Sequence, residues 1–269
     1  MTLILTELSN AGIAMAADSA ITRLSNGRII EIDQQGWTKI IRVPKITAAV
    51  SYWGMIGSIT QVQFDVWLRR VIDQEENYEN LEEFAEYIAN TLNEACNNQP
   101  LDDGEDTGIH IAGYHPWADE AQRPFFYHVH NGHGRFNIQE EKNDQGHLIS
   151  VIPTWQSEPR KLFEAHQDFP FTSEPIENSI AVLKDGYITR NGAFFIYAVL
   201  WNYMQYAFKY INLIPNVTLP RNPSNISSRK GFLHVMLEMM IQFYRCSNQS
   251  RIVGGEVTSE GIGPNGYVP

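Results

Sequence analysis

The order of residue patterns along the 269-residue chain predicts an α+β domain built in layers. Short apolar runs bounded by turn-forming residues indicate strands, and they alternate with segments whose apolar residues recur at helical spacing. The predicted order is strands, two helices, strands, two helices and a final strand. Paired helices between sets of strands favour sheets in the middle and helices outside. Because no internal repeat or linker interrupts this order, a single domain over 1–269 is expected.

The first two strands are expected at 2–8 and 12–17, as a β-hairpin that turns near Asn10. Further short apolar runs predict strands at 28–32, 37–43 and 46–52. Helical spacing then begins, and a clear helix follows Asn80, which forms a capping-box pattern with Glu83.

The second half of the chain repeats the alternation of strands and helices. Strands are predicted at 108–114, 125–130 and 251–258, and helices at 193–212 and 229–245. The segment 137–187 is mixed in pattern and interrupted by prolines, so an irregular insertion is expected there.

Charge and composition exclude several classes of protein. The formal net charge of −11 and the pI near 5.2 argue against a nucleic-acid partner. No apolar run approaches the about 18 residues that span a membrane, and no secretory signal is visible, so no membrane association is expected. The two cysteines, Cys96 and Cys246, form no CxxC pair. A protein of the reducing cytoplasm is therefore expected.

The hairpin places a hydroxyl beside a carboxylate. If the turn is centred on Asn10, the partner of residue i is close to residue 20 − i, so Thr2 is expected to lie opposite Asp18. Removal of Met1 before the small Thr2 would leave a free α-amine with a pKa of about 8. Thr2 would then carry a nucleophile and a general base in one residue. Lys39, on the strand 37–43, would supply positive charge, and Asp18 would orient it.

Three segments carry a resemblance to a known family. The block 16–22 has the pattern A-x-D-x-x-x-T, the segment 39–43 is a lysine-containing strand, and 49–54 ends in glycine. Together they resemble proteasome β-subunits and the peptidase subunit of the bacterial ATP-dependent two-component protease, which are N-terminal-nucleophile (Ntn) hydrolases. The resemblance implies a four-layer αββα sandwich. It also implies a peptide or unfolded-protein substrate, a homo-oligomeric ring, an ATPase or activator partner, and no cofactor.

The same resemblance implies roles for further residues. The backbone N–H of Ser51 would stabilise an oxyanion. Supporting positions are Ser19 and Asn191, which stands where the family has a serine. Ser247 or Ser250 would replace an aspartate of the family that this sequence lacks.

Three functions follow from these residues. The leading one is a threonine hydrolase that cleaves peptide bonds, with Thr2, Asp18 and Lys39 as catalytic residues. The missing family serine and aspartate favour a second one, a non-catalytic structural or scaffold subunit. The third is an amidohydrolase that acts on small amides.

A metal site is the remaining interpretation of the polar residues. His128 and His130 share one face of the strand 125–130, and His133 follows it. Histidines at i and i+2 can share a metal ion. Because no acid or cysteine completes the set locally, a polar strand face is the favoured interpretation and no metal is expected.

Overall fold

The structure is a computed structural model of the chain. It describes residues 2–25, 28–33, 37–54, 62–97, 107–116, 122–131, 136–142, 148–155, 164–166, 186–192, 225–246 and 253–269. All strand pairs in this part of the chain are antiparallel.

The first sheet has five strands and contains both ends of the described chain. Its order is β12-β1-β2-β13-β14. The strands are β1 (Leu3–Ser9), β2 (Gly12–Asp18), β12 (Gly186–Gly192), β13 (Val257–Gly263) and β14 (Gly266–Val268). The hairpin β1–β2 therefore lies where the sequence predicts it, with β13 and β12 on its two sides.

The second sheet also has five strands, in the order β11-β8-β7-β6-β5. They are β5 (Ile40–Val43), β6 (Ala48–Gly54), β7 (Thr107–Pro116), β8 (Gln122–His130) and β11 (Glu164–His166). Two ribbons belong to neither sheet, namely β3 (Ile21–Ser25) with β4 (Arg28–Asp33) and β9 (Phe136–Lys142) with β10 (Leu148–Trp155).

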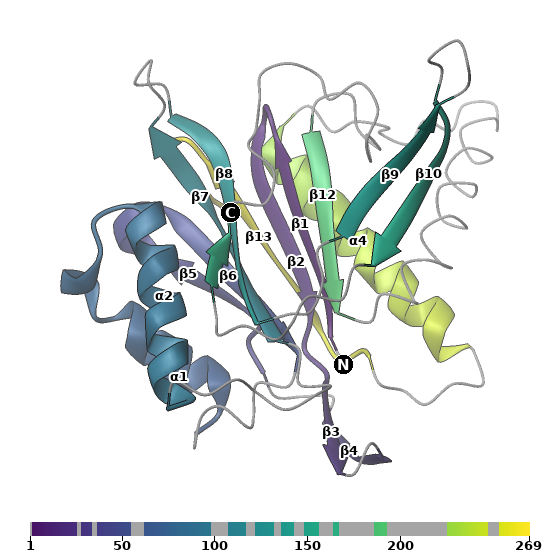
Figure 1. Cartoon of the computed structure of the whole chain (residues 1–269), viewed down its shortest axis with the longest axis horizontal. Coiled ribbons are helices and arrows are strands. Elements are labelled where there is room, and N and C mark those ends of the chain that lie inside the picture. The colour runs from purple at the N-terminus through teal and green to yellow at the C-terminus, as the bar shows by residue number, and fades with distance from the viewer. Residues whose placement is uncertain are drawn as a thin grey trace.

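The helices lie on the outer faces of the sheets. Figure 1 shows α1 (Phe64–Ile72) and α2 (Leu81–Ala95) on one side of the molecule and α4 (Ile226–Arg245) on the other. Two 3-10 turns, η1 (Pro44–Ile46) and η3 (Glu75–Asn77), join neighbouring elements. The predicted capping box starts α2, because the Asn80 side chain accepts from the Glu83 N–H at 3.0 Å and donates to the Glu83 carboxylate at 2.8 Å.

Apolar side chains fill three layers. One cluster lies between α1, α2 and the second sheet, and another between α4 and the first sheet. The third cluster lies between the two sheets and contains Ile4, Leu8 and Met15 from the first sheet with Ala49 and Phe126 from the second. Alternate residues of β1 thus face α4 and the second sheet, which explains why the whole strand is buried.

The predicted four-layer αββα sandwich is wrong. In the part of the chain that the structure describes, the first sheet is covered by α4 alone, which contacts β1, β2 and β13. One helix is about 10 Å wide and strands lie about 4.8 Å apart, so a single helix cannot form a layer over five strands. These residues form a mixed α+β arrangement of antiparallel sheets with three α-helices.

Other expectations change at particular segments. The strand β3 was not predicted, and the segment expected to be an irregular insertion contains β10 and β11 and nearly all of β9. The predicted helix 193–212 lies outside the described residues, and the last strands start at Val257 rather than 251. Of the helices that the structure describes, none combines the length and apolarity needed to cross a membrane.

Candidate active site

The hairpin register differs by one residue from the prediction. The observed pairs run from Ile4 with Ala17 to Ser9 with Gly12, so partners add up to 21 rather than 20. The reason is a two-residue loop, because Asn10 and Ala11 both lie outside the ladder. The prediction that Thr2 is the cross-strand partner of Asp18 is therefore wrong.

Lys39 joins Thr2 to Asp18 in spite of this shift. Its Nζ donates to Thr2 Oγ1 at 3.0 Å and to Asp18 Oδ1 at 2.8 Å. It also donates to the backbone oxygen of Ala20 at 2.5 Å. Lys39 and Asp18 are fully buried and Thr2 is 5% exposed. The three residues that the sequence predicts as catalytic are thus in direct hydrogen-bond contact.

Asp18 is held by the backbone of two other segments. Its Oδ1 accepts from the Leu3 N–H at 2.8 Å, and its Oδ2 accepts from the Gly254 N–H at 3.0 Å. Gly254 O in turn accepts from the N–H groups of Ser19 and Ala20. Both carboxylate oxygens therefore accept hydrogen bonds from backbone N–H groups, which holds the carboxylate in place beside Lys39.

Gly254 was missed as a site residue by sequence reasoning, although the Gly254-Gly255 pair is visible in the sequence. Its φ of +143° is a conformation that residues with a Cβ rarely adopt. Ser19, predicted as a supporting residue, belongs to the same contact, because its Oγ accepts from the Glu256 N–H at 2.9 Å.

Burial and charge act on Lys39 in opposite directions. Removal from water lowers the pKa of the Lys39 ammonium below its ordinary value, and the nearby Asp18 carboxylate raises it in part. A lysine in this environment holds its proton less firmly than a surface lysine. Its ammonium is nevertheless stabilised by three acceptors, one of which is the hydroxyl of Thr2.

Ser51, the predicted oxyanion donor, lies within the second sheet. It is 1% exposed and pairs with Ile40 on one side and His110 on the other. A residue between two antiparallel strands directs its N–H to one of them. A hydrogen bond within the sheet therefore competes with an oxyanion for the Ser51 N–H. The oxyanion role of Ser51 stays a prediction.

The remaining predicted residues are only partly described. Asn191 lies on β12 opposite Ile4, which places its backbone two strands from Asp18. Ser247, Ser250 and Met1 lie outside the described residues. The supporting roles of these residues stay predictions.

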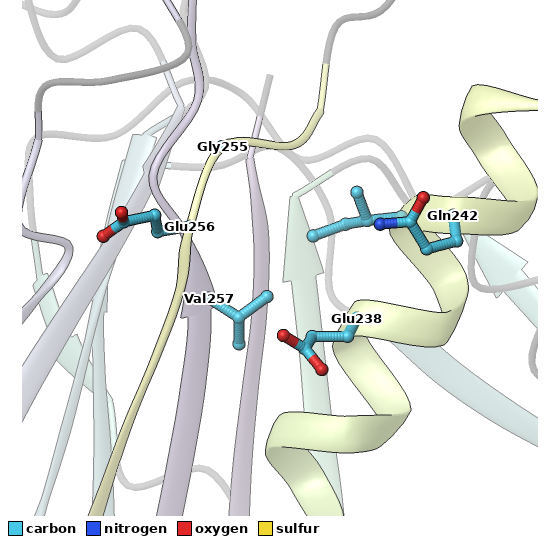
Figure 2. Close-up of a pocket in the computed structure, with 6 residues that line it drawn as sticks. Glu238, Gln242, Gly255, Glu256 and Val257 are labelled. Atoms are coloured by element: carbon cyan, nitrogen blue, oxygen red, sulfur yellow. The ribbon is translucent and has the colours of Figure 1, made fainter.

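A pocket of about 320 Å³ lies behind the Gly254 segment, between α4 and the start of β13. Figure 2 shows Glu238 and Gln242 projecting from α4 toward Val257, while the Glu256 carboxylate points away from the helix. None of Thr2, Asp18 and Lys39 lines this pocket. It is therefore separate from the candidate active site and shares with it only the segment that holds Asp18.

Comparison with known proteins finds structural neighbours only. No family model and no curated protein matches the chain. Among solved structures, Anbu (ancestral beta-subunit) from Yersinia bercovieri is similar at 15% identity, with a TM-score of 0.45, over 97% of this chain and 81% of that one. The Anbu (Gly-1) mutant from Hyphomicrobium sp. strain MC1 is similar at 11% identity, with a TM-score of 0.47, over 98% and 82% of the two chains.

These findings correct the family assignment. With TM-scores below 0.5, neither likeness assigns an activity or an assembly to this chain. Membership of the proteasome β-subunit and two-component-protease family, expected from the sequence, is wrong, because no family model supports it. The block 16–22, one of the three segments that suggested it, is only seven residues long, and its first three positions end the buried strand β2.

Proposed function

We propose that the chain is a hydrolase that cleaves peptide bonds with Thr2 as its nucleophile, after Met1 has been removed. One observation carries the proposal. The Lys39 ammonium lies 3.0 Å from Thr2 Oγ1 and 2.8 Å from Asp18, with all three side chains buried. A hydroxyl is a poor nucleophile at neutral pH and needs a base and nearby positive charge. Both are available in this arrangement once the α-amine of Thr2 is free.

The reaction has two steps. In the first, the Thr2 α-amine takes the Oγ1 proton as Oγ1 attacks the carbonyl carbon, and the resulting α-ammonium protonates the departing amine. The product is an ester on Thr2. In the second, the α-amine takes a proton from water, the hydroxide attacks the ester, and the proton returns to Oγ1. Lys39 stabilises the negative charge that develops on Oγ1, and Asp18 positions Lys39.

The proposal requires that Thr2 is the N-terminal residue of the mature chain. Intact-mass spectrometry of the purified chain is expected to show a mass lacking one methionine residue. An electrophile that requires both the hydroxyl and the free α-amine of an N-terminal threonine is then expected to label the wild type once and Thr2→Ala not at all. Thr91→Ala on α2 is the matched control and should be labelled like the wild type.

Two results would overturn the proposal, namely retained Met1 or undiminished labelling of Thr2→Ala. Hydrolysis of small amides without cleavage of peptides would keep Thr2 as nucleophile and replace the substrate class. A free N-terminal threonine without any hydrolysis would favour the scaffold function.

The same proposal includes a homo-oligomeric ring, served by an ATPase or activator. Two large apolar side chains on the outside of α4 support burial against a neighbour, because Val235 is 47% and Phe243 is 48% exposed. Light scattering of the purified protein is expected to give a multiple of 30.7 kDa. Paired Val235→Lys and Phe243→Lys substitutions should reduce that mass. A single 30.7 kDa particle for the wild type would remove the ring from the proposal.

A further inference from the structure

One face of β13 lies against α4, beside the pocket between these two elements. Ile262 belongs to the apolar cluster between the two sheets. Because side chains alternate along a strand, Gly261, Ser259 and Val257 point to the opposite face, toward α4. A Cβ on Gly261 would accordingly lie 3.4 Å from Lys230 Cδ, and Val257 packs against the apolar cluster under α4. Ser259 is therefore the hydroxyl that β13 directs toward the helix.

A serine, a histidine and a glutamate meet in the groove between β13 and α4. Ser259 Oγ lies 3.3 Å from His234 Nδ1, and His234 Nε2 lies 3.4 Å from Glu238 Oε1. Four residues of a helix rise about 6 Å and two residues of a strand about 6.6 Å. Glu238 therefore lies beside Val257 where His234 lies beside Ser259, and Glu238 and Val257 both line the pocket (Figure 2). The three polar groups thus form a row at one end of the pocket.

Glu238 favours the form of His234 that can act as a base. An ionised carboxylate only accepts, so a hydrogen bond to it places the proton of the neutral imidazole on Nε2. Nδ1 then carries a lone pair, which faces the hydroxyl of Ser259. Nucleophile, base and orienting carboxylate follow one another as in a catalytic triad, with the two imidazole nitrogens exchanged. Either nitrogen can take a proton, so the exchange leaves the proton path intact.

The row differs from an ordinary pair on a helix surface. Polar side chains at i and i+4 often interact there without any function. Here a hydroxyl from a different element completes the row at hydrogen-bond distance, and a pocket begins beside it. The His234 side chain is 33% exposed, so water and a small substrate can reach it.

We propose that Ser259, His234 and Glu238 form a second nucleophilic site, which hydrolyses short, uncharged carboxylic esters. Ser259 Oγ is the nucleophile and His234 the base, whereas Glu238 is a positioning residue. The pocket of about 320 Å³ is at the lower end of the range for small-molecule sites, which limits the acyl group to a short chain. Ile241 and Val257 give the pocket apolar walls, and the like charge of Glu238 disfavours an anionic acyl group.

The reaction transfers the acyl group first to Ser259 and then to water. Ser259 Oγ attacks the carbonyl carbon while His234 Nδ1 takes the Oγ proton, and the alcohol leaves as His234 returns this proton to its oxygen. His234 next takes a proton from water, and the hydroxide attacks the acyl-serine. The carboxylic acid leaves as the proton returns to Oγ. An alcohol leaves more readily than an amine, so an ester suits this site better than an amide.

Labelling of the full chain with a fluorophosphonate tests the proposal. Ser259 Oγ displaces fluoride from phosphorus, and peptide mass spectrometry locates the resulting phosphonate ester. We expect one adduct, on Ser259, in the wild type and equally in Thr2→Ala, because the site is independent of Thr2. Ser259→Ala should not be labelled. Ser227→Ala, at an exposed position in the first turn of α4, is the matched control and should be labelled like the wild type.

His234 and Glu238 have readouts that a merely structural role would not change. His234→Ala should slow labelling by about 100-fold or more, the usual contribution of a positioned base, and free imidazole in the buffer should restore part of the rate. Glu238→Gln should slow labelling less, because the Glu238 side chain is 55% exposed and water replaces it in part. Glu238→Asp, which keeps the carboxylate, should lie between Glu238→Gln and the wild type.

Turnover of para-nitrophenyl esters by Thr2→Ala protein separates this site from Thr2. We expect repeated turnover of the acetate, slower turnover of the dodecanoate, and loss of both when Ser259→Ala is added. An unlabelled Ser259 in the wild type, no turnover of the acetate, or turnover that Ser259→Ala does not reduce would each overturn the proposal. The adduct on wild-type Ser259 decides even where a variant does not fold by circular dichroism.

Discussion

Replacing Lys39 with methionine is expected to lower kcat for peptide hydrolysis by about 100- to 1000-fold, the loss typical of removing one preorganised group that stabilises a developing oxyanion. Methionine keeps most of the length of the side chain and removes only the ammonium. The affected atom is Thr2 Oγ1, which accepts from Lys39 Nζ at 3.0 Å. Because Lys39 is fully buried behind Thr2, KM should change little. Steady-state kinetics on a peptide substrate measure both quantities.

The matched control is Lys45→Met. Lys45 also donates to two backbone oxygens, those of Glu75 and Tyr78, but it lies beside η3 and away from Thr2. We expect the kcat of this variant to equal that of the wild type. Near-ultraviolet circular dichroism must show that Lys39→Met is folded at the assay temperature, because Asp18 loses its cation. A folded Lys39→Met with unchanged kcat would contradict the role of Lys39.

The pH dependence of the wild type provides an independent check of the same role. On the acid side, the rate should rise as the Thr2 α-amine, with an ordinary pKa of about 8, loses its proton. On the alkaline side, the rate should fall as Lys39 loses its charge. Burial lowers the pKa of Lys39 below the ordinary lysine value, so this fall should begin at a lower pH than for a surface lysine.

The free energy of unfolding should rise with pH on the alkaline side, where the rate falls. Because the folded pKa of Lys39 lies below the unfolded one, the unfolded chain binds more protons between the two values. Stability therefore rises with pH in that interval. Loss of activity without loss of structure would show that Lys39 is titrating, whereas parallel loss of both would point to unfolding. Lys39→Met should lack the alkaline fall in rate.

The candidate site could be predicted from the sequence to the extent that it is local. The turn near Asn10 brings the two ends of a hairpin together, and Lys39 precedes a short apolar strand. The predicted register of the β1–β2 hairpin differs by one residue from the observed one, because the sequence does not distinguish a turn centred on one residue from a loop of two residues. Thr2 and Asp18 are nevertheless connected, because the long side chain of Lys39 reaches both of them.

The parts that could not be predicted depend on distant residues. Gly254 N–H binds Asp18 across 236 positions, and the Arg229 guanidinium contacts Glu7 across 222. No periodicity or turn pattern encodes such pairs. The pairing of β11 with β8 was missed for a related reason, because a three-residue strand in a mixed segment has too little pattern to identify. The four-layer sandwich came from the resemblance, whereas the order of the elements predicted an α+β domain with sheets in the middle and helices outside.

The ion pair between Glu7 and Arg229 leads to the largest expected effect on stability. Glu7 lies in the middle of β1, Arg229 lies in the first turn of α4, and their side chains are 1% and 4% exposed. Glu7 Oε2 and Arg229 Nε are buried without a hydrogen bond in the described part of the chain. The pair thus holds α4 to the first sheet, but its polar atoms are incompletely satisfied.

Arg229→Met is expected to lower the free energy of unfolding by about 3–5 kcal/mol, because it leaves the Glu7 carboxylate buried without a cation. Burial already raises the pKa of Glu7, and Arg229 opposes that shift. Without Arg229 the folded pKa of Glu7 should rise further above the unfolded value. The folded chain then binds more protons in that interval, so Arg229→Met should lose stability as the pH rises through it.

The double variant Glu7→Met with Arg229→Met removes both charges. It therefore separates the loss of the attraction between Glu7 and Arg229 from the free-energy cost of burying the Glu7 carboxylate alone. Buried ion pairs replaced by apolar residues of similar volume are often neutral or more stable. We therefore expect the double variant to recover most of the stability lost in Arg229→Met and to lose its pH dependence. Urea unfolding of the four proteins in the cycle measures the coupling between the two residues.

Arg42→Met is the control for a pair whose cation is exposed. Arg42 donates to Glu260 at 2.6 Å, and its side chain is 52% exposed whereas that of Glu260 is 11% exposed, so water reaches this pair from the side of Arg42. Its effect should be about 0–1 kcal/mol. If Arg229→Met were no more destabilising than Arg42→Met, the carboxylate of Glu7 would have to reach water in the variant. The contact between β1 and the first turn of α4 would then be looser than its burial indicates.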